Sequence, residues 1–331
     1  TMVQVIMEPV AKLDGDSRPV SAFVAHADGT FEQGASAYEK RGVAVMVPEW
    51  DETKCIQCNR CSYVCPHATI RPFALTEEEV AAAPEGLQVA KMTGKGLEAL
   101  KFTMAVSPMD CMGCGVCVGE CPAKEKAIKM VPRESQEYKQ PVFDYLVANV
   151  GKKEGMPAKE TVKGSQFEKP LLEFSGSCAG CAETAYARLN TQLFGARMYI
   201  SNATGCSSIW GGPAATSPYT VNEKGHGPAW ANSLFEDNAE YGLGMASAVK
   251  HMRNGLKDRL ENLKAIDASV AGVVDAWVET MNDGEASKEA TKALVAALEA
   301  YNGADAEAKN IVAYVLENKD RKSTRLNSSH I

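Results

Sequence analysis

Two cysteine-rich blocks with the same spacing constrain this sequence most strongly. The first block reads Cys55-x2-Cys58-x2-Cys61-x3-Cys65-Pro66, and the second reads Cys111-x2-Cys114-x2-Cys117-x3-Cys121-Pro122. Three thiolates that are two residues apart can wrap around one cluster from a tight loop, and the proline then turns the chain towards a neighbouring site. This spacing is typical of chains that fold around two 4Fe–4S clusters.

In such double runs the fourth cysteine of each block binds the cluster of the other block. We therefore predict two sets of metal ligands. The first is Cys55, Cys58, Cys61 and Cys121, and the second is Cys65, Cys111, Cys114 and Cys117. A zinc array is the alternative, because thiolate ligands also suit zinc. Zinc sites usually pair two Cys-x2-Cys arms, whereas these blocks have three arms and a Cys-Pro, so iron–sulfur is favoured.

The residues between the ligands differ in the two blocks. Gly113 and Gly115 lie among the ligands of the second block, where backbone amides can turn towards cluster sulfurs, and the first block has Gln57 and Asn59 at those places. His67 follows Cys65-Pro66, but both predicted clusters already have four ligands. We therefore expect His67 to be structural.

A third group of cysteines consists of Cys178, Cys181 and Cys206. A single Cys-x2-Cys is compatible with a redox dithiol, a zinc site or a cluster. Cys206 lies in an uncharged stretch rich in Gly, Ser and Thr, residues 202–220, which resembles a loop that closes over a cofactor; the alternative is a surface loop with a buried cysteine. Three cysteines are one short of a cubane, so the last ligand is either another residue type or lies beyond the end of this sequence.

Composition and charge exclude several classes of protein. The chain has 331 residues and a net charge of −7, so it lacks the basic footprint of a nucleic-acid-binding protein. Its eleven cysteines occur without a secretory signal at the N-terminus, which favours metal ligands in a reducing compartment over disulfides. No stretch is apolar enough to predict a membrane helix. We expect a cytoplasmic protein.

The sequence divides into five parts. Residues 1–50 resemble the end of a preceding domain, and residues 51–132 form the cysteine domain. A polar linker is expected at 133–166, and a further domain at 167–320. Residues 321–331 are short, polar and unpatterned, so we interpret them as an expression or sequencing artefact, which implies that the natural chain continues past Asp320.

Two amphipathic helices are predicted in the C-terminal part. Apolar residues recur every three or four positions from Tyr241 to Leu263, and a second stripe of this kind runs from Ala286 to Tyr301. We expect both stripes to pack in a core rather than to carry chemistry.

Seven segments in this order closely resemble the pyruvate:ferredoxin (flavodoxin) oxidoreductase family, also called pyruvate synthases. They are Tyr-Glu-Lys-Arg-Gly (38–42), Cys-Ile-Gln-Cys-Asn (55–59), Val-Cys-Pro-His-Ala (64–68), the second cysteine block, Cys-Ala-Gly-Cys (178–181), Gly-Cys-Ser-Ser-Ile-Trp (205–210) and Ser-Leu-Phe-Glu-Asp-Asn-Ala-Glu (233–240). The resemblance extends from the start of the sequence to about Asp320.

The resemblance implies a fold class and an activity. The fold would be an α+β ferredoxin-like domain with two 4Fe–4S clusters, followed by part of an α/β domain that binds thiamine diphosphate. The whole enzyme would decarboxylate pyruvate with thiamine diphosphate, give acetyl-CoA from CoA, release CO2 and pass electrons through three 4Fe–4S clusters to ferredoxin or flavodoxin. Such an enzyme belongs to anaerobic metabolism and is expected to be a homodimer.

The resemblance also implies roles for residues outside the two blocks. Cys178, Cys181 and Cys206 would bind the third cluster, whose fourth cysteine would lie downstream. Glu183 and Cys206 would contribute to the thiamine diphosphate pocket, although Ala182 stands where the family usually has glycine. The family's Gly-Asp-Gly motif for Mg²⁺ and diphosphate would follow Asp320, and the main catalytic residues would lie in a preceding domain. This segment alone is therefore expected to be inactive.

A free two-cluster electron carrier is the alternative function. A Gly-Asp-Gly segment and a further cysteine downstream would favour the enzyme, and their absence would favour the carrier. Charge does not locate an acceptor surface, because the basic and acidic residues of 51–132 nearly balance.

Overall fold

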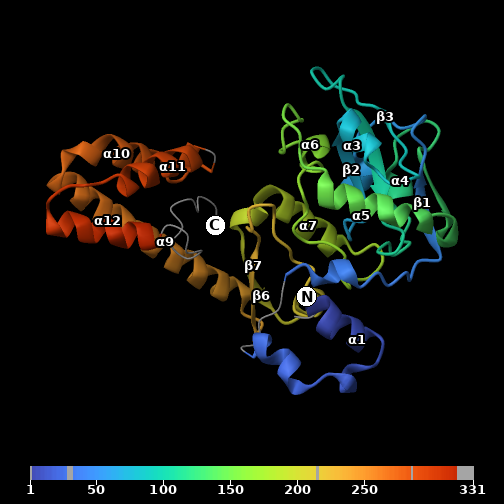
Figure 1. The fold of residues 1–331 in the computed structure, drawn as a ribbon, viewed down its shortest axis with the longest axis horizontal. Coiled ribbons are helices and arrows are strands. Elements are labelled where there is room, and N and C mark those ends of the chain that lie inside the picture. The colour runs from blue at the N-terminus through green and yellow to red at the C-terminus, as the bar shows by residue number, and fades with distance from the viewer. Residues whose placement is uncertain (1, 28–32, 214–215, 285, 319–331) are drawn as a thin grey trace. The chain divides into compact units, whose positions relative to one another are not determined.

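The computed structural model describes residues 2–27, 33–213, 216–284 and 286–318, and the helices and strands of this part are shown in Figure 1. The chain forms two compact units. The first comprises Thr1–Ala196 with Gly205–Pro228, and the second comprises Arg197–Thr204 with Ala229–Ile331. None of the described helices is both long enough and apolar enough to cross a lipid bilayer. The predicted artefact at 321–331 lies outside the described residues.

The cysteine domain in the first unit is built from two similar halves. Strand β1 (Met46–Trp50) precedes the first block and β2 (Ile70–Leu75) follows it, while β4 (Lys101–Val106) precedes the second block and β5 (Ile128–Pro132) follows it. The strands pair across the halves, because β1 is antiparallel to β5 and β2 is antiparallel to β4. Each strand pair therefore joins the start of one half to the end of the other.

Short elements complete this domain. Helix α2 (Arg60–Tyr63) lies within the first block and α4 (Val116–Glu120) within the second. Strand β3 (Ala90–Lys91) pairs with β4, so the larger sheet has the order β2-β4-β3. Pro72 is tolerated in β2 because β2 is an edge strand of this sheet, where a missing N–H breaks no ladder. Helix α3 (Glu77–Ala81) follows β2 and begins with a capping box between Thr76 and Glu79.

The core of the cysteine domain contains both aromatic residues and cysteines. Trp50 of β1 meets Phe102 of β4 edge to face, with ring centroids 5.9 Å apart. Ile70 and Ile128 are buried beside them, and Cys65 and Cys117 belong to the same apolar cluster. Burial of this apolar surface is the main favourable contribution to the stability of the domain, and it places the cysteines at the core.

Residues 133–166, expected as a linker, contain two helices. Helix α5 (Gln140–Asn149) lies beside the larger sheet in Figure 1, and its Phe143 and Leu146 are buried in a cluster with Leu75 of β2. Helix α6 (Val162–Ser165) begins at Thr161, whose hydroxyl accepts a hydrogen bond from the Gly164 N–H.

Further helical elements precede and follow the cysteine domain in the chain. N-terminal to it lie η1 (Val3–Met7), α1 (Glu8–Ala11), η2 (Gly15–Ser17), η3 (Val20–His26) and η4 (Ala35–Tyr38). The turns η5 (Arg133–Ser135) and η6 (Glu137–Lys139) follow β5, and α7 (Ala182–Phe194), η7 (Gly195–Arg197) and α8 (Cys206–Gly211) lie C-terminal to the domain.

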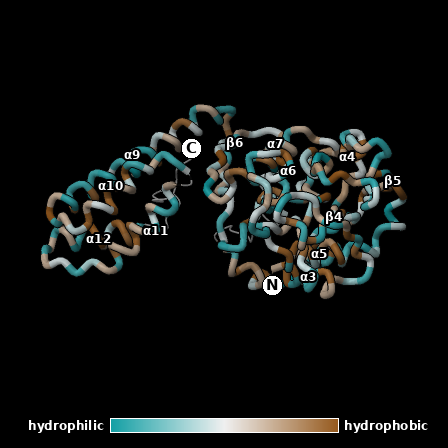
Figure 2. Tube along the Cα trace, turned by 90° about the horizontal axis from the view of Figure 1, so that it is seen from above, coloured by the Kyte–Doolittle hydropathy of each residue, from teal (hydrophilic) through white to brown (hydrophobic). Residues whose placement is uncertain are grey.

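The second unit combines a parallel strand pair with four helices. Strand β6 (Tyr199–Ala203) runs parallel to β7 (Ala229–Ser233). Helix α9 (Asn238–Ile266), the turn η8 (Ala268–Val270), α10 (Ala271–Thr280), α11 (Ala286–Glu299) and α12 (Ala306–Asn318) follow. In Figure 2 the tube of these helices changes repeatedly between hydrophilic and hydrophobic residues, as expected of amphipathic helices.

Both helices predicted from apolar periodicity are confirmed. The stripe from Tyr241 to Leu263 lies on α9, and that from Ala286 to Tyr301 lies mainly on α11. The two stripes meet in one apolar cluster that also includes Trp277 of α10. The fully buried members include Leu260, Leu263, Trp277 and Leu294. The prediction of core packing is therefore confirmed for the second stripe and for Leu256, Leu260 and Leu263 of the first, whereas Tyr241, Met245 and Met252 are only partly buried and are not members of this cluster.

Candidate iron–sulfur sites

The predicted ligands of the first cluster line one small cavity. Three of them, Cys55, Cys58 and Cys61, come from the first block, and Cys121 comes from the second. The remaining lining residues are largely apolar and include Ile56, Met104 and Ile128. The fold thus brings together cysteines of both blocks in the combination predicted from spacing, because each strand pair joins opposite halves of the repeat.

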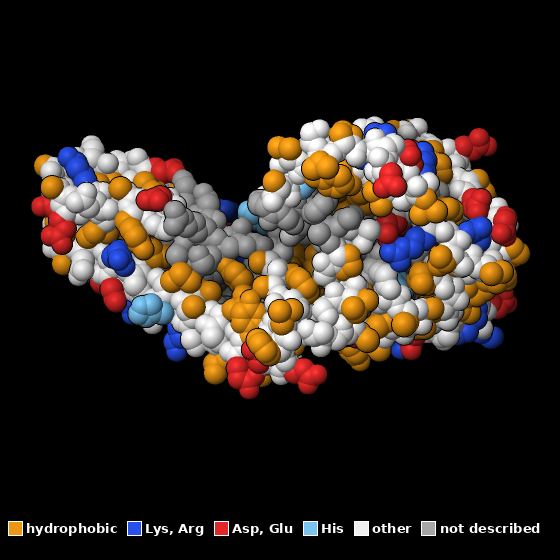
Figure 3. Space-filling model, turned by 90° about the horizontal axis from the view of Figure 1, so that it is seen from below, with side chains coloured by type: hydrophobic (Ala, Val, Ile, Leu, Met, Phe, Trp, Pro, Cys, Tyr) orange, Lys and Arg blue, Asp and Glu red, His pale blue; other side chains and the backbone are white. Residues whose placement is uncertain are grey.

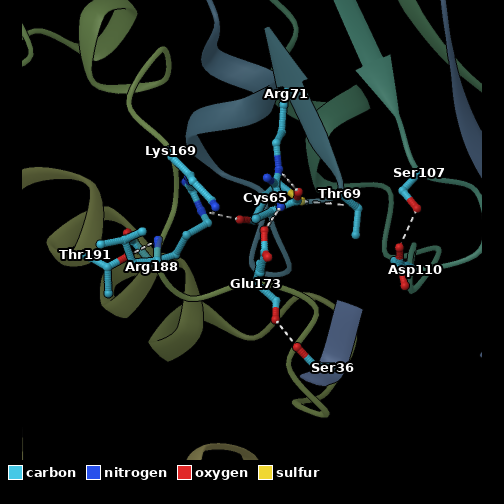
Figure 4. Close-up of polar contacts among 12 residues, drawn as sticks. Ser36, Cys65, Thr69, Arg71, Ser107, Asp110, Lys169, Glu173, Arg188 and Thr191 are labelled. Carbon is cyan, nitrogen blue, oxygen red and sulfur yellow. Dashed lines mark hydrogen bonds and ion pairs between the residues drawn. The ribbon is translucent and has the colours of Figure 1, made fainter. Parts of the chain in front are cut away.

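The second predicted set is also gathered in one place. The Cys111 thiol is influenced electrostatically by Cys65 and Cys114, and the Cys117 thiol is influenced by Cys65, Cys111 and Cys114. Cys65 itself is only 8% exposed, and its sulfur lies 3.4 Å from the Thr69 hydroxyl (Figure 4). Cys65, a residue of the first block, is therefore close to Cys111 and Cys117 of the second block, and Cys114 is close to the same two cysteines.

Burial strongly favours the neutral thiol at several of these cysteines. Desolvation, together with a smaller contribution from neighbouring cysteines, raises the pKa of Cys111 and Cys117 to about 12. Burial also raises the pKa of Cys55 and brings that of Cys61 well above its ordinary value. Thiolates in these positions need a bound cation, and a coordinating metal deprotonates its thiol ligands outright.

Backbone N–H groups point at the first cysteine of each block. The Gln57 N–H donates to Cys55 Sγ and the Gly113 N–H donates to Cys111 Sγ, both at 3.4 Å. Both donors have a left-handed backbone, with φ of 56° at Gln57 and 69° at Gly113. The prediction that an amide of the second block turns towards sulfur is confirmed at Gly113, whereas the equivalent amide of Gln57 was missed. Alignment of the two blocks could have identified it.

The side chains of Gln57 and Asn59 attach the first block to later segments. Gln57 Nε2 donates to the Lys91 carbonyl at 2.8 Å, and its Oε1 accepts from the Thr93 N–H at 2.9 Å. Asn59 Nδ2 donates to the Lys163 carbonyl at 3.0 Å. Both side chains are buried, so these bonds replace hydrogen bonds to water.

His67 is held between two backbone carbonyls. Its Nδ1 lies 3.2 Å from the Ser175 oxygen, and its Nε2 lies 3.2 Å from the Cys178 oxygen. Burial lowers the pKa of His67, and the two carbonyls only partly offset this. These contacts fit the expected structural role, because the imidazole joins the end of the first block to the Cys178 loop.

The third cysteine group borders the second block. An added Cβ at Gly180, which has φ of 76°, would lie 3.6 Å from the Cys114 Cβ and 3.7 Å from Val116. The loop with Cys178 and Cys181 therefore lies directly against the exposed cysteine of the second block.

Cys206 begins helix α8, and Cys181 precedes helix α7. The two helices are connected by Trp210 of α8, whose Nε1–H donates to Glu183 Oε2 at 3.4 Å. Glu183 is exposed in the first turn of α7, where a carboxylate is favoured by the helix dipole. Tyr219 packs against Trp210, and burial, followed by the Glu183 charge, raises its pKa.

The Tyr-Glu-Lys-Arg-Gly segment is fixed to the second block. Lys40 Nζ lies 2.6 Å from Asp110 Oδ2, directly before Cys111, and 5.1 Å from the Phe174 ring centroid. Asp110 also accepts from the Ser107 hydroxyl at 2.6 Å (Figure 4). Burial raises the pKa of Asp110, while the Lys40 charge opposes this shift. In the sequence this segment was significant only as one of those that carry the family resemblance.

One buried arginine lies beside the cysteine blocks and was not predicted as a site residue. Arg188 of α7 donates from Nε to the Cys65 carbonyl at 2.8 Å and from Nη2 to the Tyr63 carbonyl at 2.6 Å. Burial lowers its pKa to about 10, so it remains a cation at neutral pH. No sequence signal indicates this contact, because Arg188 and Cys65 are far apart in the chain.

Within the described part of the chain, no three His, Cys, Asp or Glu side chains are grouped tightly enough to hold a single metal ion. In a cubane each thiolate binds a different iron, so the ligands surround a cluster rather than one ion.

Comparisons with known proteins find a 4Fe–4S domain over the two cysteine blocks. Residues 54–125 match a 4Fe-4S dicluster domain, and residues 1–44 match EKR, a domain of unknown function. The fold and the gathered cysteines thus define a protein with a ferredoxin-type 4Fe–4S dicluster domain.

Three relatives identify the family. The chain is 51% identical over 286 residues to the pyruvate-flavodoxin oxidoreductase of Klebsiella pneumoniae, covering 86% of this chain and 24% of that protein. It is 47% identical over 329 residues to the pyruvate:ferredoxin oxidoreductase of Moorella thermoacetica, covering 96% and 27%. It is also 44% identical over 301 residues to the mitochondrial pyruvate dehydrogenase (NADP⁺) of Euglena gracilis, covering 89% and 16%. The chain belongs to the pyruvate:ferredoxin (flavodoxin) oxidoreductase family, and it spans about a quarter of the length of the first two relatives.

Proposed function

We propose that this chain is the electron-relay segment of an enzyme that oxidatively decarboxylates pyruvate. In the full reaction pyruvate and CoA would give acetyl-CoA and CO2, and two electrons would pass singly to ferredoxin or flavodoxin. The observation that carries this proposal is the cavity lined by Cys55, Cys58, Cys61 and Cys121, which combines both blocks. The names of the relatives suggest pyruvate as the substrate and ferredoxin or flavodoxin as the electron acceptor.

The donor set of each cysteine group fits a cubane. Four soft thiolates would hold the first cluster, and Cys65, Cys111, Cys114 and Cys117 would hold the second. Iron supplies the positive charge that these buried thiols need, and each cluster exchanges one electron at a time when bound. The backbone amides of Gln57 and Gly113 stabilise sulfur charge. We assign Cys178, Cys181 and Cys206 to a third cluster. We assign no residue of this chain as its fourth ligand.

The thiamine diphosphate role of Glu183 and Cys206 is supported less directly. The contact between Glu183 and Trp210 places α8, which begins at Cys206, beside the first turn of α7. The parallel pair β6 and β7 in the second unit agrees with the expected α/β domain. We assign no Mg²⁺ or diphosphate ligand to a residue of this chain. CoA use and homodimer formation remain predictions of the resemblance, and a cytoplasmic location remains a prediction from the N-terminal sequence and composition.

No acceptor surface is assigned. On the face drawn in Figure 3, acidic and basic side chains are interspersed, without a large area of one sign. This agrees with the nearly balanced charge of residues 51–132. Charge therefore does not locate the acceptor surface.

The proposal is tested by anaerobic purification of the full chain followed by iron and zinc analysis and EPR spectroscopy. We expect brown protein with about eight or more irons per chain and a dithionite-reducible signal. Addition of pyruvate and CoA to the complete enzyme should generate the same reduced signal. Stoichiometric zinc in colourless protein would contradict the cluster assignment. Clusters that respond to dithionite but not to pyruvate and CoA would favour the free carrier.

A further inference from the structure

Arg188 is a fully buried cation that touches the segment between the two cluster sites. Its side chain is 1% exposed, and its guanidinium donates to the carbonyls of Tyr63 and Cys65. Its other partners are the amide oxygens of Gln166 at 3.0 Å and Gln192 at 2.6 Å. All four acceptors are neutral oxygens, so the hydrogen bonds are satisfied but the charge is not neutralised.

A neighbouring buried arginine shows how such a charge is usually neutralised. Arg71 is also buried, and it forms an ion pair with the buried carboxylate of Glu173 (Figure 4). In contrast, no carboxylate of the described residues lies within ion-pair distance of Arg188. Burial strongly disfavours a guanidinium without a counter-charge, so a nearby negative charge would stabilise it.

The residues around Arg188 indicate where this negative charge resides. Cys61 belongs to the first predicted ligand set and Cys65 to the second, and Arg188 bonds to the short segment that connects them. A 4Fe–4S core with four thiolates is anionic, and reduction adds one more negative charge. A fixed cation beside it therefore stabilises the reduced form more than the oxidised form.

We propose that Arg188 is the fixed counter-charge of the two clusters and raises their reduction potentials, most strongly for the cluster on Cys65, Cys111, Cys114 and Cys117. The inference rests on the proposed clusters. Arg188 acts through its charge and is a positioning residue, not a catalytic one. Lys163 is a second cation, near Cys55 and Cys58, but it is partly exposed, so water screens its charge.

A purely structural role would have a different signature. Tyr63 ends helix α2, and an arginine that bonds to the last carbonyls of a helix can simply stabilise that end. Loss of such a role would lower the thermal stability and the iron content without changing the potential of the clusters that remain. The reduction potential therefore separates the two roles.

The test is an EPR-monitored redox titration of the full chain with its clusters loaded. Arg188→Gln removes the charge, and Arg188→Lys retains it. Gln166→Glu keeps the arginine but places a carboxylate where Arg188 Nη1 now meets an amide oxygen. Lys169→Gln is the matched control, because it removes one positive charge from an exposed side chain of the same region.

We expect Arg188→Gln and Gln166→Glu to lower the potential of the second cluster, with an effect of about tenfold on the equilibrium constant for reduction, or about 59 mV for a one-electron couple. Arg188→Lys and Lys169→Gln should remain close to the wild type. If the Arg188→Gln protein does not bind its clusters, the reduction potential of the Gln166→Glu protein tests the inference instead. Unchanged potentials in a loaded Arg188→Gln or Gln166→Glu protein would overturn the inference, whereas wild-type protein without clusters would overturn the proposed function as well.

Discussion

The two cysteine blocks have the same ligand spacing, but they are attached to the protein differently. In the first block the positive-φ positions are Gln57 and Asn59, whose buried side chains bond to the Lys91 and Lys163 carbonyls. In the second block they are Gly113 and Gly115, which have no side chain. The first block is therefore fixed by side-chain hydrogen bonds to later segments of the chain.

The second block is fixed by its backbone and by charge. Gly113 approaches the Met46 carbonyl, and Asp110 is paired with Lys40. Its Cys114 is exposed and lies against Gly180, in the loop of the third cysteine group. The comparison teaches that the same spacing predicts the same ligands in both blocks, whereas the intervening residues decide which segments of the protein each block contacts.

The strongest test of the paired arrangement is removal of one ligand. Cys121→Ala should abolish the cluster of the first block, because its sulfur lines that cavity, and iron should fall by about four atoms per chain. Adding Cys58→Ala should remove no more iron, whereas adding Cys111→Ala should remove the second cluster as well. Equal losses in the two double variants, measured by iron analysis, would contradict the exchange of ligands between blocks.

The next largest effect is on stability, and it concerns the residue directly before each block, which is Asp110 before the second and Lys54 before the first. Lys40→Met leaves Asp110 buried without its cation, so we expect the free energy of unfolding to fall by about 3 kcal/mol. Lys54 precedes Cys55 but is exposed, so Lys54→Met should change stability little. Urea unfolding under anaerobic conditions measures both, and Asp110→Asn should restore much of the loss in the Lys40→Met protein. Similar losses of unfolding free energy in the Lys40→Met and Lys54→Met proteins would show that the two blocks do not differ in this way.

The two glycines of the second block should also differ. An alanine Cβ at Gly113 would lie 3.0 Å from the Met46 oxygen and 3.2 Å from the Ala44 Cβ, while Gly115 faces open space. Both have positive φ, which costs an alanine about 1 kcal/mol. We expect about 2 kcal/mol or more for Gly113→Ala, because crowding adds to the strain, and about 1 kcal/mol for Gly115→Ala. A larger loss of unfolding free energy for Gly115→Ala in the same urea experiment would show that the neighbours of Gly113 move aside for the added Cβ.

The smallest effect is a pH dependence in the β1–β5 strand pair. A hydrogen bond from Lys129, at 2.9 Å, lowers the pKa of Glu49 below its ordinary value of 4.5, and burial partly opposes this shift. Because the folded-state pKa is the lower one, the contribution is complete above pH 4.5 and is lost as the pH falls through the folded-state pKa. The stability difference between wild type and Glu49→Gln should therefore shrink below about pH 4.5. A difference that is constant from pH 6 to pH 3 would contradict this role.

Much of the cysteine chemistry could be predicted from the sequence. Spacing alone paired Cys121 with the first block and Cys65 with the second, because the double-run pattern has few geometric solutions. The two amphipathic helices, α9 and α11, were also predictable from their period. In these cases the information lies in short intervals along the chain: the spacing of cysteines within each block and the period of apolar residues in the helices.

Other contacts could not be predicted, because they join distant segments. Residues 133–166 had the polarity of a linker, yet Phe143 of α5 is buried in the core of the domain. The position of Lys40 beside Asp110 depends on the return of the chain through Gly42, whose N–H donates to the Met109 carbonyl at 2.8 Å. Propensity and periodicity describe local conformation and do not specify such pairings.

The sequence by itself therefore predicted the kind of cluster and the cysteines proposed to bind it, because thiolate chemistry and short spacing leave little freedom. Only the tertiary structure decided which charges surround those ligands. Arg188 lies beside Cys65 because α7 packs against the end of the first block, and burial then makes its charge effective. The electrostatic environment of a cluster depends on distances in space, and the order of residues along the chain does not contain them.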